Sequence, residues 1–158
     1  MTSMPTRITE EFDKLLYDGD SEAARDFLAP YLAAGSAEAS YLSSCIGTGE
    51  DEDSFEKRSH LAIQEAAARG YVPAVYDMGL CYLFGHHVEK DATAAAKCFS
   101  IASEAGYPAA MYELGLALFH GVGVVQDVSE ALSLIRRSAA GGDEYAVEFL
   151  AAHDFRDE

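Results

Sequence analysis

Three histidines in the middle of the chain have the residue type that could bind a metal ion. His86 and His87 are adjacent, His120 lies further along, and Glu89 and Asp91 follow the first two closely. Imidazole and carboxylate groups are ordinary zinc ligands. The spacing, however, matches no finger or zincin pattern, and two adjacent histidines seldom bind one ion together. The sequence therefore predicts no metal and no other cofactor.

Side chains that could support catalysis are also sparse. Glu113 and His120 share one face of a predicted helix, but this pair alone is too little for an acid–base site. The Gly-x-Gly at 121–123 follows a helix rather than a strand, so it is not a phosphate-binding loop. We expect no serine or cysteine nucleophile in a recognisable motif, such as the Ser-x-x-Lys of β-lactam-binding hydrolases. The sequence therefore predicts that the protein is not an enzyme.

Charge and composition restrict the class of partner. The 158 residues include 11 lysines and arginines against 27 aspartates and glutamates, which gives a formal net charge of −16. This balance disfavours nucleic acids and anionic membranes, whose binding needs positive charge. Hydrophobic residues make up 49% of the chain, too many for disorder, yet no apolar run is long enough to span a membrane. We therefore expect a folded acidic domain whose partner is another protein, with a basic protein as one alternative.

The cysteines and the N-terminal segment indicate a compartment. Cys45, Cys81 and Cys98 are an odd number without paired spacing, and the opening MTSMPTRITEEFDKLL lacks the apolar core of a signal peptide. We therefore expect a reducing, cytoplasmic location, with the three cysteines acting as small buried side chains.

An internal repeat determines the predicted fold. Residues 70–91 and 106–127 align at an offset of 36. The matched pairs include Gly70 with Gly106, Tyr76 with Tyr112, Gly79 with Gly115, Gly85 with Gly121, and Asp91 with Asp127. Each unit has apolar residues at three- and four-residue steps, which is typical of amphipathic helices. A period of this length predicts a stack of helix pairs.

Acidic residues and glycines predict where these helices begin and end. Asp91 and Asp127 are suited to N-capping the second helix of each unit, and the pairs Asp127–Glu130 and Asp53–Glu56 have capping-box spacing. Gly106 and Gly142 are suited to end that helix in the left-handed conformation. The mid-helix Gly79 and Gly115 predict positions where a neighbouring helix approaches closely.

The sequence predicts that the whole chain, 1–158, forms one solenoid of about four helix pairs. Two clear units lie between more degenerate ones, and a single helix closes the stack, as stacked repeats require. The approximate boundaries are 6–34 and 35–70 for the degenerate units, 71–106 and 107–142 for the clear units, and 143–155 for the capping helix.

The clear units resemble Sel1-like repeats, relatives of the tetratricopeptide repeat with a longer loop between their helices. The resemblance rests on Leu-Gly at 114–115, Gly-x-Gly-Val at 121–124, Asp127, Ala139 and Gly142, and on the matching positions of the preceding unit. It implies an all-α, right-handed superhelix that is a non-catalytic scaffold. His87 replaces the second loop glycine of the pattern, so we expect that loop to take another shape.

The resemblance also implies a binding face, because the first helices of such a stack line its concave side. We expect a partner helix or extended peptide to contact an aromatic and aliphatic stripe there. Packing between repeats is the alternative for the same side chains. The stripe consists of Tyr41, Tyr76, Leu80, Leu83, Phe84, Tyr112, Leu116, Phe119 and His120.

The resemblance also suggests a β-lactam-binding hydrolase, against which the expected absence of a Ser-x-x-Lys motif counts. Two further functions from different classes remain open from the sequence. The first is an adaptor that binds another protein through this stripe. The second is a bacterial cytoplasmic immunity or inhibitor protein that neutralises a basic toxin, a use known for some Sel1-like modules. The acidic run at 50–53 is either a solvated loop or a group that steers a basic partner electrostatically.

Overall fold

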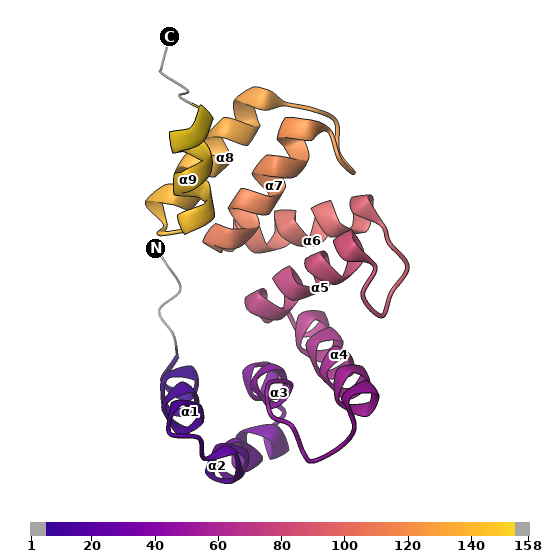
Figure 1. The fold of residues 1–158 in the computed structure, drawn as a ribbon, viewed down its shortest axis with the longest axis vertical. Helices are drawn as coiled ribbons and strands as arrows, with labels where there is room; N and C mark the ends of the chain where they lie inside the picture. Colours follow the sequence, from indigo (N-terminus) through magenta and orange to yellow (C-terminus); the bar gives the residue numbers. More distant parts are fainter. Residues whose placement is uncertain (1–5, 154–158) are drawn as a thin grey trace. The chain divides into compact units, whose positions relative to one another are not determined.

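The computed structural model describes residues 6–153, and every regular element in that range is an α-helix (Figure 1). This confirms the predicted all-α class. The helices in chain order are α1 (Arg7–Tyr17), α2 (Ser21–Ala33), α3 (Ala37–Ser43), α4 (Glu52–Ala68), α5 (Val72–Phe84), α6 (Ala92–Glu104), α7 (Pro108–His120), α8 (Val128–Ala140) and α9 (Glu144–His153). The expected capping helix at 143–155 thus corresponds to α9, and its last two residues lie outside the described range.

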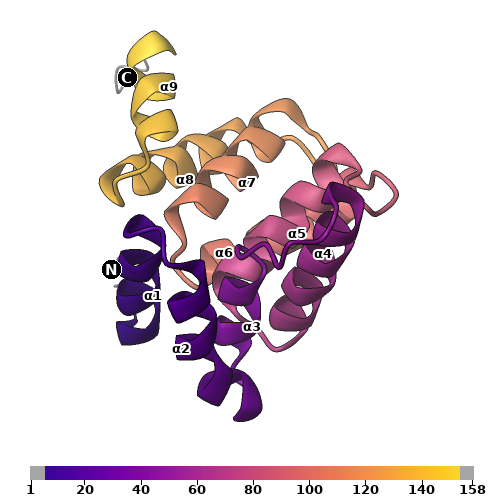
Figure 2. The same cartoon turned by 60° about the horizontal axis from the view of Figure 1, so that its bottom comes forward.

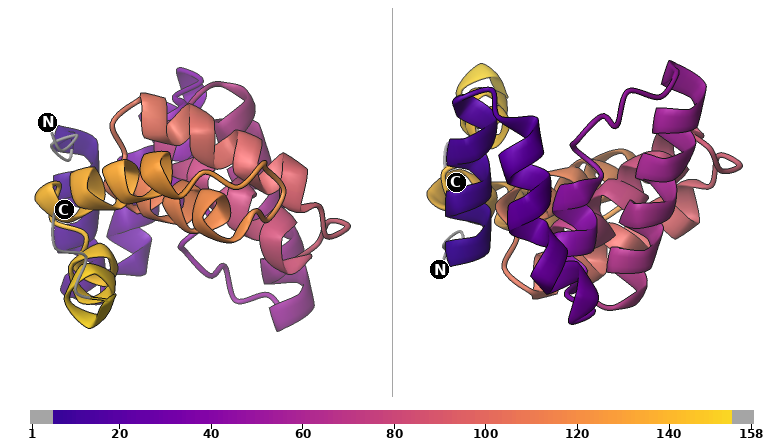
Figure 3. Two further views of the ribbon diagram at one scale, coloured as in Figure 1. Left: turned by 90° about the horizontal axis from the view of Figure 1, so that it is seen from above. Right: turned by 90° about the horizontal axis from the view of Figure 1, so that it is seen from below.

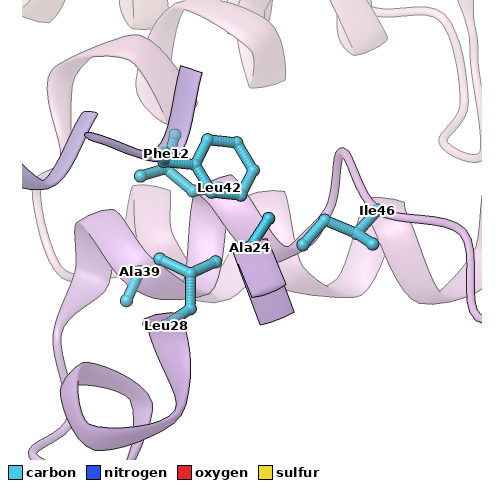
Figure 4. Packing of buried hydrophobic residues seen from close by; sticks show 6 residues of the cluster. All are labelled: Phe12, Ala24, Leu28, Ala39, Leu42 and Ile46. Carbon is cyan, nitrogen blue, oxygen red and sulfur yellow. The ribbon is translucent and has the colours of Figure 1, made fainter. Parts of the chain in front are cut away.

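The described chain forms two compact units, residues 6–77 and 78–153, and the division falls within α5. In the first unit, helices α1, α2 and α3 lie side by side and pack against one another, and α3 also packs on α4 (Figures 2 and 3). Their shared core contains Phe12, Ala24, Leu28, Ala39, Leu42 and Ile46 (Figure 4). Burial of Phe12 and Leu28 alone stabilises this unit by about 1.5–3 kcal/mol for each side chain.

In the second unit, α7 packs on both α6 and α8, and α8 packs on α9 (Figure 1). Phe99 of α6 and Ile135 of α8 are its largest fully buried apolar side chains. A Cβ atom at Gly79 would lie 2.5 Å from the Phe99 ring, and one at Gly115 would lie 2.6 Å from Ile135 Cγ1. These glycines therefore allow the second helix of each pair to approach the first, as the repeat predicts.

The second helices of the clear units begin where the sequence predicts. Oδ1 of Asp91 accepts hydrogen bonds from the N–H groups of Thr93 and Ala94, and Oδ1 of Asp127 accepts one from Glu130 N–H at 3.0 Å. Each bond satisfies an N–H that has no partner within the helix.

The capping box predicted at Asp53 and Glu56 is wrong. Helix α4 starts at Glu52, and its N-cap is Asp51, whose Oδ1 accepts a hydrogen bond from Ser54 N–H at 3.1 Å. The run of acidic residues offers several caps of equal chemistry, so the sequence alone did not distinguish them.

The prediction that the loop at His87 takes another shape is also wrong. His87 has φ +57°, close to the +72° of Gly123 at the equivalent position. Both loops also close with the same backbone hydrogen bond, from Asp91 N to Tyr82 O at 2.9 Å and from Asp127 N to Leu118 O at 3.0 Å. Residues 85–91 therefore keep the loop conformation although a histidine replaces the glycine.

Candidate protein-binding site

The end of α5 and one face of α7 carry the predicted stripe of the second unit. Phe84, the last residue of α5, is 60% exposed, and His120, the last residue of α7, is also exposed. The other predicted side chains of this unit are half-buried: Leu80, Leu83, Tyr112, Leu116 and Phe119.

Three of these predicted residues line one small cavity. Leu83, Leu116 and His120 surround a space of about 170 Å³ between α5, α6 and α7, with Phe99 and alanines of α6 on its other side. Glu113 is the second polar residue at this cavity. Burial, and secondarily the nearby charge of Asp143, raise the pKa of its carboxyl group.

Two predicted residues of α7 turn instead toward α9. The ring of Tyr112 lies 6.4 Å from that of Tyr145 and 6.3 Å from that of Phe149, and the Phe119 ring lies 5.6 Å from Phe149. Burial raises the pKa of Tyr112, as do the charges of Glu113, Asp143 and Glu148. Tyr112 and Phe119 therefore hold α9 on α7, which corresponds to the packing alternative of the sequence analysis.

The remaining predicted residues belong to the first unit. Tyr41 of α3 donates a hydrogen bond from its hydroxyl to Asp77 Oδ2 at 2.9 Å, and its ring lies 5.2 Å from that of Tyr71. Tyr76 is half-buried.

A larger cleft in the second unit was not predicted. It has a volume of about 600 Å³ and lies between α6 and α8, over Leu114 and Leu118 of α7. Its sides carry Lys97 and Glu104 from α6 and Glu130 and Arg137 from α8, along with hydroxyl groups and smaller side chains. The three- and four-residue spacing of Thr93, Lys97, Ser100 and Glu104 is the sequence signal for this polar face of α6. The family resemblance predicts binding on the first helices and therefore does not indicate this cleft.

The acidic run at 50–53 is largely occupied by internal contacts. Glu50 forms an ion pair with Arg58 at 2.7 Å, Asp51 caps α4, and Asp53 forms an ion pair with Lys57 at 2.6 Å. Hydrogen bonds from Arg58 lower the pKa of Glu50. Three of the four carboxylates thus have partners within the chain at or before the start of α4.

The expectation that no Ser-x-x-Lys motif is present is wrong, because Ser54 and Lys57 have this spacing. Both lie on the exposed first turns of α4. The Ser54 hydroxyl donates to Asp51 Oδ2 at 2.9 Å, and Lys57 Nζ lies 2.6 Å from Asp53. The serine and the lysine therefore take part in capping and surface pairing.

Metal-binding and thiol groups are dispersed. Across residues 6–153, no three histidine, cysteine or carboxylate side chains gather closely enough to hold a metal ion. Cys45 is exposed, contrary to the buried position expected for it, while Cys81 and Cys98 are half-buried. No helix of the described range is long and apolar enough to cross a membrane.

Comparison with known families agrees with the repeat found in the sequence. The model of the family described as "Sel1 repeat" matches residues 72–107 and 108–143. These two segments together make up a little under half of the chain. The chain contains two Sel1 repeats. Sel1 repeats generally act as protein–protein interaction scaffolds, and Sel1 repeat proteins are typically non-catalytic. A search of curated protein sequences found no match.

Solved structures of Sel1 repeat proteins have the same solenoid fold. A Sel1 repeat protein from Oxalobacter formigenes is 28% identical, with a TM-score of 0.69 over 79% of this chain and 95% of that one. A protective antigen of uropathogenic Escherichia coli is 26% identical, with a TM-score of 0.66 over 77% of this chain but only 26% of that one. Helicobacter pylori cysteine-rich protein B shares the fold, at 16% identity and a TM-score of 0.59, over 92% of this chain and 98% of that one.

Proposed function

We propose that this Sel1 repeat protein is an adaptor that binds a helix or extended peptide of a partner protein. The binding face is formed by the end of α5 and by α7, which are the first helices of the two repeats and belong to the side expected to be concave. The observation that carries the proposal is the apolar cavity lined by Leu83 and Leu116, with the exposed ring of Phe84 next to Leu83 in the chain. A few side chains that one protein inserts into pockets of the other dominate the energy of protein interfaces.

The predicted residues have different parts in this proposal. Phe84, Leu83, Leu116 and His120 contact the partner directly, because they are exposed or line the cavity. Leu80 extends the same helix face, whereas Tyr112 and Phe119 support it from the side of α9. A contact of the partner with Tyr41 and Tyr76 stays a prediction for the first unit.

The experiment is capture of the partner from a native lysate, compared between wild type and Phe84→Ala. Phe84 is 60% exposed, so its removal should leave the fold intact and lower partner recovery at least about tenfold. Ile101→Ala is the matched control, because Ile101 is a 58% exposed apolar residue of α6. Equal recovery with wild type and Phe84→Ala would contradict the proposed face.

The net charge of −16 supports a second candidate, an immunity or inhibitor protein that neutralises a basic toxin. Binding would then weaken steeply with salt, because the attraction between opposite charges is screened. Capture at low and moderate ionic strength separates the two candidates. A partner retained at moderate salt supports the apolar adaptor face, and a basic partner released by salt supports inhibition.

A further inference from the structure

The cavity between α5, α6 and α7 has the size of one side chain. Its volume of about 170 Å³ is well below the roughly 300–1,000 Å³ of sites that hold small-molecule ligands. A cofactor or metabolite of the size that such sites hold therefore does not fit, whereas a single anchor residue of a partner does. The cavity is open at the surface near two exposed side chains, His120 and Val122.

The chemistry of the lining restricts that anchor further. The walls are aliphatic or aromatic apart from Glu113 and His120. Glu113 is half-buried, and within residues 6–153 no cation pairs with its carboxylate. Another carboxylate, Asp143, lies near enough for its charge to add to the effect of burial in raising the pKa of Glu113. A purely apolar anchor would remove water from Glu113 without replacing its hydrogen bonds, which is costly for a charged group.

We propose that this cavity receives a lysine or arginine side chain of the partner. Its aliphatic stem would contact Leu83, Phe99 and Leu116, and its cationic group would bind the carboxylate of Glu113. The surrounding charge favours this occupant, since residues 78–153 contain nine carboxylates and four basic side chains. The inference rests on the proposed function and specifies the residue that the partner inserts.

The test is a selection of binders to the full chain from a displayed library of random peptides. The selected peptides should share a lysine or arginine, and replacement of that residue by norleucine or citrulline should weaken binding about tenfold. Glu113→Gln in the protein should weaken the binding of the unmodified peptides by a similar factor. Glu89→Gln, which removes an exposed carboxylate from the α5–α6 loop, should leave their affinity unchanged.

A double-mutant cycle separates direct contact from a structural effect. If the cation binds Glu113, the norleucine substitution should have little further effect on binding to Glu113→Gln. Peptides that bind wild type and Glu113→Gln equally, or that lack a shared basic residue, would overturn the cavity assignment. Such peptides would still support the adaptor function.

A selection that yields no peptide would contradict the adaptor function, and the cavity is then judged by a second measurement. N-acetylarginine methylamide is titrated into the full chain while the methyl resonances of Leu83 and Leu116 are followed by NMR. Saturable shifts in wild type that disappear in Glu113→Gln are the expected result. Absence of such shifts in wild type would overturn the cavity assignment as well.

Discussion

The hydroxyl group of Tyr41 donates a hydrogen bond of 2.9 Å to Oδ2 of Asp77, which joins α3 to α5 within the first unit. Burial raises the pKa of Asp77, and the hydrogen bond from Tyr41 opposes this rise only in part. The charged carboxylate thus loses more hydration on folding than one hydroxyl group restores.

Asp77→Asn should therefore stabilise the protein at pH 7. The amide oxygen can still accept the hydrogen bond from Tyr41, while the cost of burying a charge is removed. The pKa of Asp77 is higher in the folded than in the unfolded protein, so its protonated form favours folding. This contribution is complete below the unfolded pKa near 3.8 and is lost as the pH rises through the folded pKa. The advantage of Asp77→Asn should accordingly shrink as the pH falls from 7 towards 4, in chemical denaturation measured by circular dichroism.

Tyr41→Phe is the companion variant. It removes the only donor recorded for Asp77 in the described chain and should destabilise the protein by about 1–2 kcal/mol at pH 7. If Asp77→Asn were less stable than wild type at pH 7, or if its advantage did not depend on pH, the carboxylate would not carry the expected burial cost.

The guanidinium group of Arg58 should be the main support of the loop between α3 and α4. It donates to Ser43 O at 3.2 Å and Ile46 O at 2.7 Å, and it pairs with Glu50. Arg58→Gln should lower the free energy of unfolding by about 1–2 kcal/mol, because two carbonyl groups and a carboxylate lose their donor. Because Arg58 lowers the pKa of Glu50, part of this difference should disappear as the pH falls below the ordinary Glu50 value of 4.5.

Lys57→Gln is the matched control on the same helix. Its ion pair with Asp53 is exposed on both sides, so its loss should cost less than about 0.5 kcal/mol. Equal effects of the two substitutions in denaturation experiments would show that the carbonyl contacts of Arg58 do not stabilise the loop.

The parts of the fold that depend on local chemistry could be predicted from the sequence. Asp91 and Asp127 begin helices because a carboxylate accepts the first free N–H groups, and Gly106 ends one because it adopts a positive φ of +87°. The repeat aligns Gly79 with Gly115 and predicts that a neighbouring helix approaches closely at both. In the structure these neighbours are the second helices, through Phe99 and Ile135. Each of these features is set by residues within one repeat, so it could be predicted without knowing how more distant parts of the chain pack.

The details of the candidate site depend on which faces the neighbouring helices leave open, and the sequence does not show this. Tyr112 and Phe119 were expected on the binding stripe, but α9 supplies Phe149 as their neighbour. The sequence predicts no acid–base role for Glu113, and the fold places this residue beside an apolar cavity. The cleft between α6 and α8 likewise arises from the packing of three helices.

His87 is the non-glycine residue with positive φ among residues 6–153, and its replacement by glycine should stabilise the α5–α6 loop. The left-handed conformation costs a residue with a Cβ atom roughly 1 kcal/mol, part of which is offset by the greater freedom of glycine in the unfolded chain. We therefore expect a gain of up to about 0.5–1 kcal/mol in thermal or chemical denaturation. A loss of stability would mean that the contacts of the imidazole ring outweigh the backbone strain.

Gly123, at the equivalent position of the next repeat, should tolerate no side chain. A Cβ atom there would overlap the backbone of Ala92 and approach Thr93 N at the start of α6. Since backbone atoms cannot move aside as a flexible side chain can, Gly123→Ala should destabilise the protein by about 2–4 kcal/mol, of which roughly 1 kcal/mol is due to the φ of +72°. Gly142→Ala isolates this smaller part, because Gly142 also has a positive φ but no heavy atom lies within 4 Å of the added carbon. Equal losses for the two variants would show that the contact with Ala92 relaxes, and that the loop glycine is required only for its conformation.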